Sequence, residues 1–249
     1  MTNVIAPDKI RTSVREHYAD LARKSSSCCG PSACECESDY PDQLANAVPD
    51  DITNFSLGCG DPITIATLKP GETVVDLGSG GGLDCFLAAR QVGATGRVIG
   101  IDMTPEMLAK ARSNVARLGV TNVEFREGFI EHLPIADGEA DVVISNCVIN
   151  LSPDKPQVFR DIFRVLRPGG RISISDIVTN GELPALVQQS MEAWGACVAG
   201  ALDVKDYADG LRAAGFVDVK VEPKGKFEAG LSKMPMHVAF SAIITALKP

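Results

Sequence analysis

Cysteine is the residue type in this chain that is best suited to unusual chemistry. Thiolates are soft donors that select soft, thiophilic centres, and a thiol must give up its proton to bind one. The chain has eight cysteines, of which four lie far apart in the sequence: Cys59, Cys85, Cys147 and Cys197. A single cysteine is more often a small buried hydrophobe, so a joint role requires a fold that gathers these residues. We expect Cys85, which lies in a predicted helix, to be a core residue.

The other four cysteines crowd into one short segment near the N-terminus. They are Cys28, Cys29, Cys34 and Cys36. Ser, Gly and Pro break all hydrophobic periodicity around them, which predicts a loop or a mobile lid over about residues 25–50. A zinc site is one reading of this cluster, although its C-C and C-x-C spacings depart from the usual C-x-x-C knuckle.

A glycine-rich turn is the second chemical feature. The apolar run TVVDL is followed by GSGGG and then by a helical pattern, which places the glycines at a strand-to-helix turn. Glycines let the main chain pass within contact distance of a ligand, which a Cβ would obstruct. Asp102 ends the next apolar run and is placed to hold a ribose. A dinucleotide is the natural competitor, but the glycine spacing departs from its G-x-G-x-x-G fingerprint.

The elements that must position these residues alternate between strands and helices from Glu72 onward. This alternation predicts an α/β fold with a doubly wound, mostly parallel sheet, whose ligands lie at the carboxyl ends of the strands. Cys147 directly follows the predicted strand ADVVISN and therefore lies at that edge. Apolar runs predict strands at residues 73–77, 97–102, 123–128, 140–146, 171–177, 216–222 and 237–247.

Helical patterns flank this core on both sides. Ile10, Val14, Tyr18 and Leu21 recur at near-helical spacing after Pro7, which predicts an amphipathic helix that must pack on another element. Residues 183–202 and 204–215 are also predicted to be helical, and the two closing strands are expected to pair antiparallel at the sheet edge. We expect three parts: an N-terminal helix and Cys-rich cap (1–60), a cofactor-binding core (61–180), and substrate-site helices with the closing strands (181–249).

Four motifs together resemble class I S-adenosylmethionine-dependent methyltransferases. They are DLGSGGG, IDM, GFIEHLP and RVLRPGGRI, and they span most of the chain. The contexts of three cysteines, LGCGDP, SNCVINLSPDK and WGACVAGAL, resemble the cysteine-bearing motifs of the arsenite methyltransferase family. The similarity to that family runs from VREHYADL to about Leu202.

The resemblance implies a seven-stranded Rossmann-like methyltransferase sheet with an N-terminal cap and a helical insertion before the last strands. It also implies S-adenosylmethionine as cofactor. Asp102 would accept hydrogen bonds from the ribose hydroxyls, Met103 and Ile130 would sandwich the adenine, and the glycines of the turn would face the methionine end. Asn146 would border the transferable methyl. The implied cofactor-binding residues are Asp76, Gly78, Gly80, Asp102, Met103, Ile130 and Asn146.

The resemblance further implies that Cys59, Cys147 and Cys197 bind arsenite and carry its methylation to methylated arsenicals. Three sulfur ligands leave a lone pair on trivalent arsenic, which can attack the methyl group without a general base. Because the transfer formally oxidises arsenic, the family is thought to regenerate the trivalent state through a cysteine disulfide that thioredoxin or a small thiol reduces. Cys28 and Cys29 are the preferred pair for this redox step.

Composition narrows the partners. The net charge is −8, from 32 acidic and 24 basic residues, and no run of basic residues is present, so nucleic acid is a poor partner. The N-terminus lacks the apolar stretch of a signal peptide and no segment has the length of a membrane span, so we expect a cytosolic protein without membrane contact. His17, His132 and His237 show no metal-ligand spacing. Two alternatives stay open: a methyltransferase for a small organic acceptor, and a metalloid-binding redox protein.

Overall fold

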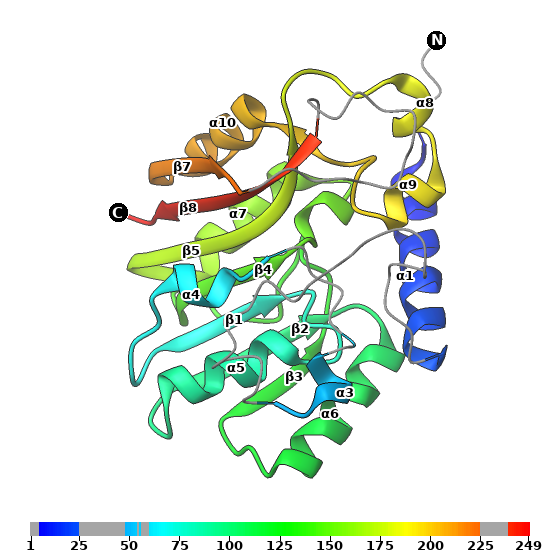
Figure 1. Ribbon diagram of the computed structural model, residues 1–249. Coiled ribbons are helices and arrows are strands. Elements are labelled where there is room, and N and C mark those ends of the chain that lie inside the picture. Colours follow the sequence, from blue (N-terminus) through cyan, green and yellow to red (C-terminus); the bar gives the residue numbers. More distant parts are fainter. Residues whose placement is uncertain (1–4, 25–47, 54, 56–59, 225–238) are drawn as a thin grey trace.

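The computed structural model describes residues 5–24, 48–53, 55, 60–224 and 239–249 (Figure 1). Cys59 and the four N-terminal cysteines lie outside the described residues, as does most of the segment predicted to be a loop or lid. The described helices are α1 Pro7–Lys24, α3 Asp50–Thr53, α4 Pro62–Ala66, α5 Leu83–Val92, α6 Pro105–Leu118, α7 Lys155–Val165, α8 Ala185–Gln188, α9 Met191–Gly195 and α10 Val204–Ala214, with the 3₁₀ turn η1 Ile149–Leu151.

A single mixed sheet in the order β3-β2-β1-β4-β5-β8-β7 forms the centre of the molecule, and the short β6 pairs with the end of β5. The pairs among β1 to β5 are parallel, whereas β8 is antiparallel to both β5 and β7. The predicted doubly wound sheet with an antiparallel closing edge is confirmed. The strands are β1 Thr73–Leu77, β2 Arg97–Asp102, β3 Val123–Glu127, β4 Ala140–Asn146, β5 Leu166–Thr179, β6 Leu202–Asp203, β7 Val217–Pro223 and β8 Ala239–Leu247.

Hydrophobic cores form on both faces of the sheet because neighbouring strand residues point to opposite sides. Val75 packs in the core that includes side chains of α7 and α10, whereas Val74 packs with α4, α5 and α6. Both valines are fully buried. Burial on both faces explains why the strands read as continuous apolar runs rather than as alternating patterns.

The amphipathic helix α1 packs at the end of the sheet. Ile10 and Val14 share a small core with Ala193 and Trp194 of α9. Figure 1 shows α1 upright beside the sheet with α9 next to it. The apolar stripe of this helix therefore packs against the α9 region, together with Met103 and Leu151.

The prediction of helix over residues 183–202 is only partly right. Two short helices, α8 and α9, are followed by an irregular loop in which Cys197 has a φ of 61°. Gly200 packs so closely that a Cβ there would lie 2.0 Å from the carbonyl oxygen of Asn150. A long-range contact of this kind overrides the local helical pattern. Within the described part of the chain, no helix is long and apolar enough to cross a membrane.

The core on the α7 and α10 side gives a direct test of packing. Leu211 is fully buried, whereas Leu186 is 85% exposed. We expect Leu211→Ala to lower the free energy of unfolding by about 2–5 kcal/mol, because the truncation leaves a cavity. Leu186→Ala, the same change on the surface, should alter it by less than about 0.5 kcal/mol. Urea unfolding of both variants measures this difference, and equal effects would contradict the assigned packing.

Candidate functional site

A cavity opens at the carboxyl ends of β1, β2 and β4, beneath α1. Its walls come from the glycine turn, the residues after β2, the segment after β3 and the end of β4. Asp76 does not line the cavity, because it is buried below the glycine turn. The other six residues predicted to bind the cofactor all line it: Gly78, Gly80, Asp102, Met103, Ile130 and Asn146.

Asp102 holds the glycine turn in place. One carboxylate oxygen accepts the Gly80 N–H at 2.9 Å, and the other accepts the Thr104 N–H at 2.8 Å. Burial raises the pKa of Asp102, and these backbone donors act in the opposite direction. Gly78 has a φ of +65°, and a Cβ there would lie 2.5 Å from Val148. The turn therefore requires glycine as well as the carboxylate.

The cavity has the chemical character that S-adenosylmethionine needs. A Cβ on Gly80 would meet no atom within 4 Å, so the turn leaves room for a ligand beside the main chain. The Asp102 oxygens are hydrogen-bond acceptors suited to ribose hydroxyls. Met103 and Ile130 supply the apolar surface that an adenine ring requires. The residues present fit this cofactor.

Asp84 lines the same cavity and was missed by the sequence analysis. Its position as the second residue of α5, directly after the glycine turn, was the available signal. The neighbouring Cys85 is fully buried, which confirms it as a core residue, and its thiol donates to Asp76 at 3.2 Å. Burial raises the pKa of Asp76 well above its usual value, and the negative charge of Asp84 adds to this effect.

Cys147 and Cys197 come together although they are 50 residues apart. The thiol of Cys197 donates to the carbonyl oxygen of Cys147 at 2.8 Å. Cys147 lines the cavity, and Cys197 lies behind it in an apolar cluster with Ile177 and Val198. Both cysteines are buried and both have left-handed backbone conformations, with φ of 58° and 61°. Such φ values are uncommon for residues other than glycine.

The chain next to Cys59 lies at the same edge. Gly60 O accepts a hydrogen bond from the Asn146 amide at 2.7 Å. A Cβ on Gly60 would lie 1.9 Å from Ser175 Oγ, so its backbone rests directly on β5. Cys147 N–H donates to Ser175 O at 2.8 Å, which places both Gly60 and Cys147 against one residue. Asn146 also donates to Asp84 at 3.3 Å and so links this region to the cofactor cavity.

Helix α1 closes the cavity from above with side chains that the sequence did not assign to the site. Arg11, Val14 and Tyr18 all line it. The guanidinium of Arg11 contacts the buried carboxylate of Glu131 at 3.3 Å, and the Tyr18 hydroxyl lies 3.7 Å from Cys197 Sγ. The apolar stripe of α1 predicted that the helix packs on another element but could not identify that element. The contacts of Arg11 and Tyr18 are with residues more than 100 positions away in the sequence.

Comparison with known proteins is consistent with this geometry. A family model described as a methyltransferase domain matches residues 68–215. An arsenite methyltransferase from Halobacterium salinarum is 48% identical over 98% of this chain and 68% of its own length. One from Aquipseudomonas alcaligenes is 40% identical over 84% of this chain and 60% of its own length. The chain belongs to the arsenite methyltransferase family.

A solved structure agrees with this assignment. The arsenic(III) S-adenosylmethionine methyltransferase from Chlamydomonas reinhardtii is 37% identical, with a TM-score of 0.75, and the match covers 84% of this chain and 74% of that one. The Rossmann-like methyltransferase fold and S-adenosylmethionine as methyl donor, both implied by the sequence motifs, are confirmed.

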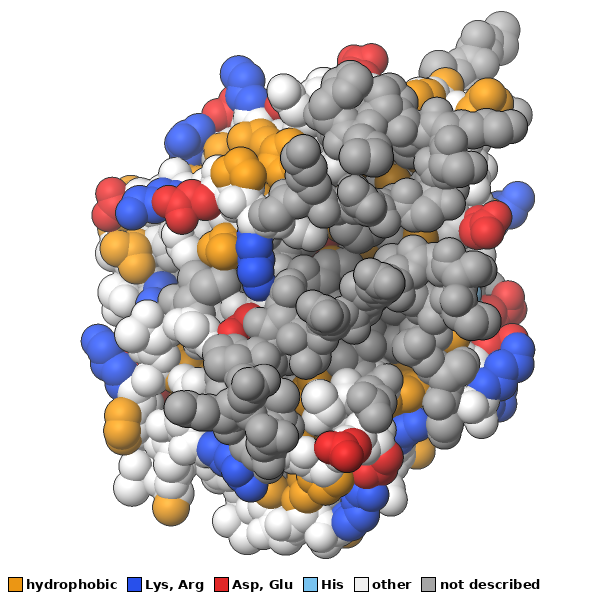
Figure 2. Space-filling view, viewed as in Figure 1, with side chains coloured by type: hydrophobic (Ala, Val, Ile, Leu, Met, Phe, Trp, Pro, Cys, Tyr) orange, Lys and Arg blue, Asp and Glu red, His pale blue; other side chains and the backbone are white. Residues whose placement is uncertain are grey.

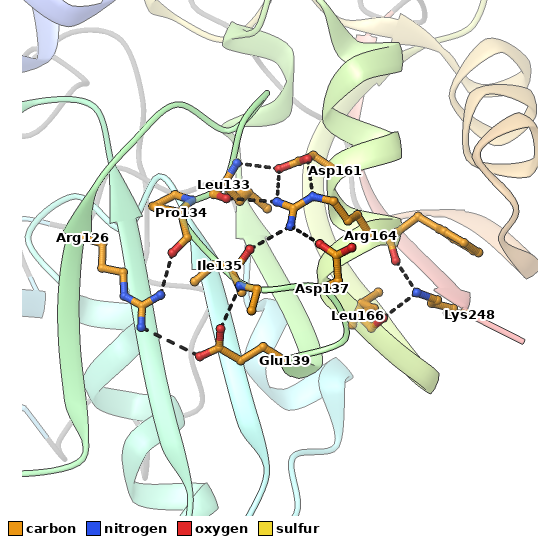
Figure 3. A network of polar contacts seen from close by, with 12 residues as sticks. Arg126, Leu133, Pro134, Ile135, Asp137, Glu139, Asp161, Arg164, Leu166 and Lys248 are labelled. Atoms are coloured by element: carbon orange, nitrogen blue, oxygen red, sulfur yellow. Dashed lines mark hydrogen bonds and ion pairs between the residues drawn. The ribbon is translucent and has the colours of Figure 1, made fainter.

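A polar network fixes the segment that carries Ile130 in this methyltransferase (Figure 3). The guanidinium of Arg164, near the end of α7, donates to the carbonyl oxygens of Leu133 and Ile135 at 3.0 and 2.8 Å. It also pairs with Asp137 and Asp161, and these carboxylates raise the pKa of Arg164. The segment between β3 and β4 is thereby tied to α7, which holds one wall of the cavity in position.

Asp176, on β5 behind the thiols, is a fully buried carboxylate. Burial raises its pKa to about 7, although the N–H groups of Ile177 and Asn150 and the ammonium of Lys155 favour the charged form. Burial also lowers the pKa of Lys155 to about 8. Tyr207, fully buried nearby, has its pKa raised by burial and by Asp176. Burial therefore makes the charged form of each of these groups less favourable in the folded state than in water.

The raised pKa of Asp176 predicts a pH dependence of stability. Its folded pKa of about 7 exceeds the ordinary aspartate pKa of 3.8, so the folded state binds more protons between these values and loses stability as pH rises. Asp176→Asn has no titrating carboxyl group at this position, so its unfolding free energy lacks this contribution to the pH dependence. From pH 5 to pH 7, the unfolding free energy of wild type should therefore fall by about 2 kcal/mol relative to that of the variant. Urea unfolding at these pH values measures it, and a constant difference would refute the assignment.

Proposed function

We propose that this chain transfers methyl groups from S-adenosylmethionine to thiol-bound trivalent arsenic. The observation that carries the proposal is the convergence of Cys147 and Cys197 beside the cofactor cavity, with the Cys197 thiol 2.8 Å from the Cys147 carbonyl oxygen. Two thiols in one apolar cluster suit a soft, thiophilic centre. The names of the relatives support the same acceptor.

The cofactor would be held by the residues that line the cavity. Asp102 would accept the ribose hydroxyls while it keeps the glycine turn fixed through Gly80. Met103 and Ile130 would cover the adenine, and Asn146 would border the reacting end. When bound, S-adenosylmethionine supplies an electrophilic methyl group on a sulfonium. Helix α1 above the cavity limits the access of water to this group.

Arsenite would be bound by Cys59, Cys147 and Cys197. Each thiol that replaces a hydroxide of arsenite passes its proton to that hydroxide, which leaves as water, so three thiols release three waters. The third thiol has support from Gly60, its chain neighbour, whose carbonyl Asn146 holds at 2.7 Å. The remaining lone pair on arsenic is the nucleophile and needs no base.

The redox step and the cellular setting are further parts of the proposal. Methyl transfer formally removes two electrons from arsenic, and a dithiol that forms a disulfide returns them. We propose Cys28 and Cys29 as this dithiol, thioredoxin or a small thiol as its reductant, methylated arsenicals as products, and the cytosol as location. We expect no nucleic-acid partner, because the net charge of the chain is negative. The face shown in Figure 2 carries dispersed charged side chains of both signs, which is consistent with this expectation.

The proposed division of labour has three parts. Residues 1–60 would form the cap, 61–180 the cofactor core, and 181–249 the substrate-site helices and closing strands. Cys197 in the last part and Cys147 in the second would then share one arsenic atom, so arsenic binding would couple two of the parts.

Methyl transfer from radiolabelled S-adenosylmethionine to arsenite, with a thiol reductant present, tests the acceptor. We expect labelled methylarsenic with wild type and none with Cys147→Ser or Cys59→Ser, because each variant lacks one sulfur ligand. Cys85→Ser keeps a hydrogen-bond donor for Asp76 at a buried position that does not line the cavity, so it should retain transfer. Calorimetry with S-adenosylhomocysteine should show unchanged cofactor affinity in Cys147→Ser. Transfer to arsenic in that variant, or a loss of cofactor binding, would overturn its role.

The cofactor role of Asp102 has its own test. Asp102→Ala removes the acceptor of the ribose hydroxyls and releases the Gly80 N–H. We expect its affinity for S-adenosylhomocysteine to fall by about tenfold or more, the effect of losing a hydrogen bond to a charged group. The matched change Asp206→Ala, at an exposed carboxylate of α10, should leave the affinity as in wild type. Equal affinities in calorimetry would place the ribose elsewhere.

A further inference from the structure

We infer that Asn150 is the positioning residue that sets the spacing of the two thiols; this rests on the proposed function. Asn150 lies in η1, three residues after Cys147, and is fully buried. Its amide nitrogen donates to Ile177 O at 2.7 Å and to Cys197 O at 3.2 Å. One side chain thereby joins the turn after β4, the end of β5 and the loop after α9.

The main chain of Asn150 is anchored to the same places. Its N–H donates to Asp176 Oδ2 at 3.3 Å, and Asp176 Oδ1 accepts the Ile177 N–H at 3.0 Å. Its carbonyl oxygen lies against Gly200, where a Cβ would approach to 2.0 Å. The loop after α9 therefore contacts Asn150 at both Cys197 and Gly200. Asn150 is thus anchored to β5, and through its other contacts it holds the loop after α9.

The cysteine backbones need this support. A left-handed conformation costs a residue with a Cβ about 1–2 kcal/mol and persists only where the surroundings enforce it. Cys147 is held by its N–H bond to Ser175 O and by the Cys197 thiol at its carbonyl. Cys197 is held by its N–H bond to Trp194 O and by the Asn150 amide at its carbonyl. Loss of the amide removes the hydrogen bond that holds the Cys197 carbonyl and lets the second thiol move away from the first.

Asn150 acts on the thiols and not on the cofactor. It does not line the cavity, and among the described residues its Oδ1 has no hydrogen-bond partner. The two hydrogen bonds that the Asn150 side chain makes to the site are therefore those donated by its amide N–H groups. Asn122 offers a matched comparison, because its amide also donates to two carbonyl oxygens, Ala89 O at 3.1 Å and Gly93 O at 2.9 Å, at a place away from the cavity.

The test compares Asn150→Ala with Asn122→Ala in the full chain. Phenylarsine oxide is the probe, since its arsenic takes two thiols and its binding does not depend on methyl transfer; Cys197→Ser defines the part of the binding that the pair provides. We expect Asn150→Ala to weaken that part about tenfold or more and to raise the KM for arsenite, with the KM for S-adenosylmethionine unchanged. Asn122→Ala should leave both KM values and the probe affinity as in wild type.

The outcomes separate the inference from the proposed function. Wild-type binding of phenylarsine oxide in Asn150→Ala, or a rise of both KM values together, would overturn the role of Asn150. Gly200→Ala supplies a second variant, because its Cβ displaces the loop while Asn150 is retained, and it should also weaken probe binding without changing cofactor affinity. A wild-type protein that binds the probe through Cys147 and Cys197 but methylates no arsenite would refute the proposed function and leave the positioning role intact.

Discussion

The parallel pairing of β4 with β5 is the constraint on which the site depends. Its register sets Asn146 beside Ser175, so the polar end of β4 and the buried carboxylate of β5 reach the same edge of the sheet. Cys147 N–H extends this ladder by one bond, to Ser175 O, before the chain turns away with positive φ. A shift of this register by one residue would point Asn146 and Ser175 to the opposite faces. It would separate the thiol from the cofactor cavity.

Three carboxylates lie in or directly beneath the wall of the cavity that this pairing borders. Asp76 and Asp102 are buried, Asp84 lies beside them, and their mutual repulsion adds to the burial that raises the pKa of Asp76. A cation placed next to such carboxylates relieves this repulsion, whereas a neutral ligand does not. S-adenosylmethionine would bring a sulfonium cation to this region, and the nearby carboxylates would attract that cation more strongly than they would attract a neutral thioether.

Local sequence patterns predicted the parts of this molecule that are built from neighbours in the chain. The strand-to-helix turn with Gly78 and Gly80, the position of Asp102 at the end of β2, and Cys147 at the edge of β4 all follow from apolar runs and glycine placement. The loop that holds Cys197 did not follow, because its sequence is helical in pattern and its backbone contacts Asn150, 47 residues away from Cys197, at both Cys197 and Gly200. The sequence pattern placed Tyr18 on the apolar face of the N-terminal helix. Its approach to Cys197 could not be predicted in this way, because it depends on how α1 packs on the rest of the fold.

The resting state of the two thiols fits the chemistry proposed for them. The Cys197 thiol donates a hydrogen bond to the Cys147 carbonyl oxygen, and both cysteines lie in one apolar cluster. When a thiol exchanges with a hydroxide of arsenite, the thiol proton leaves with the hydroxide as water. The products are neutral arsenic–sulfur bonds, so the exchange leaves no net charge to be stabilised in the apolar cluster.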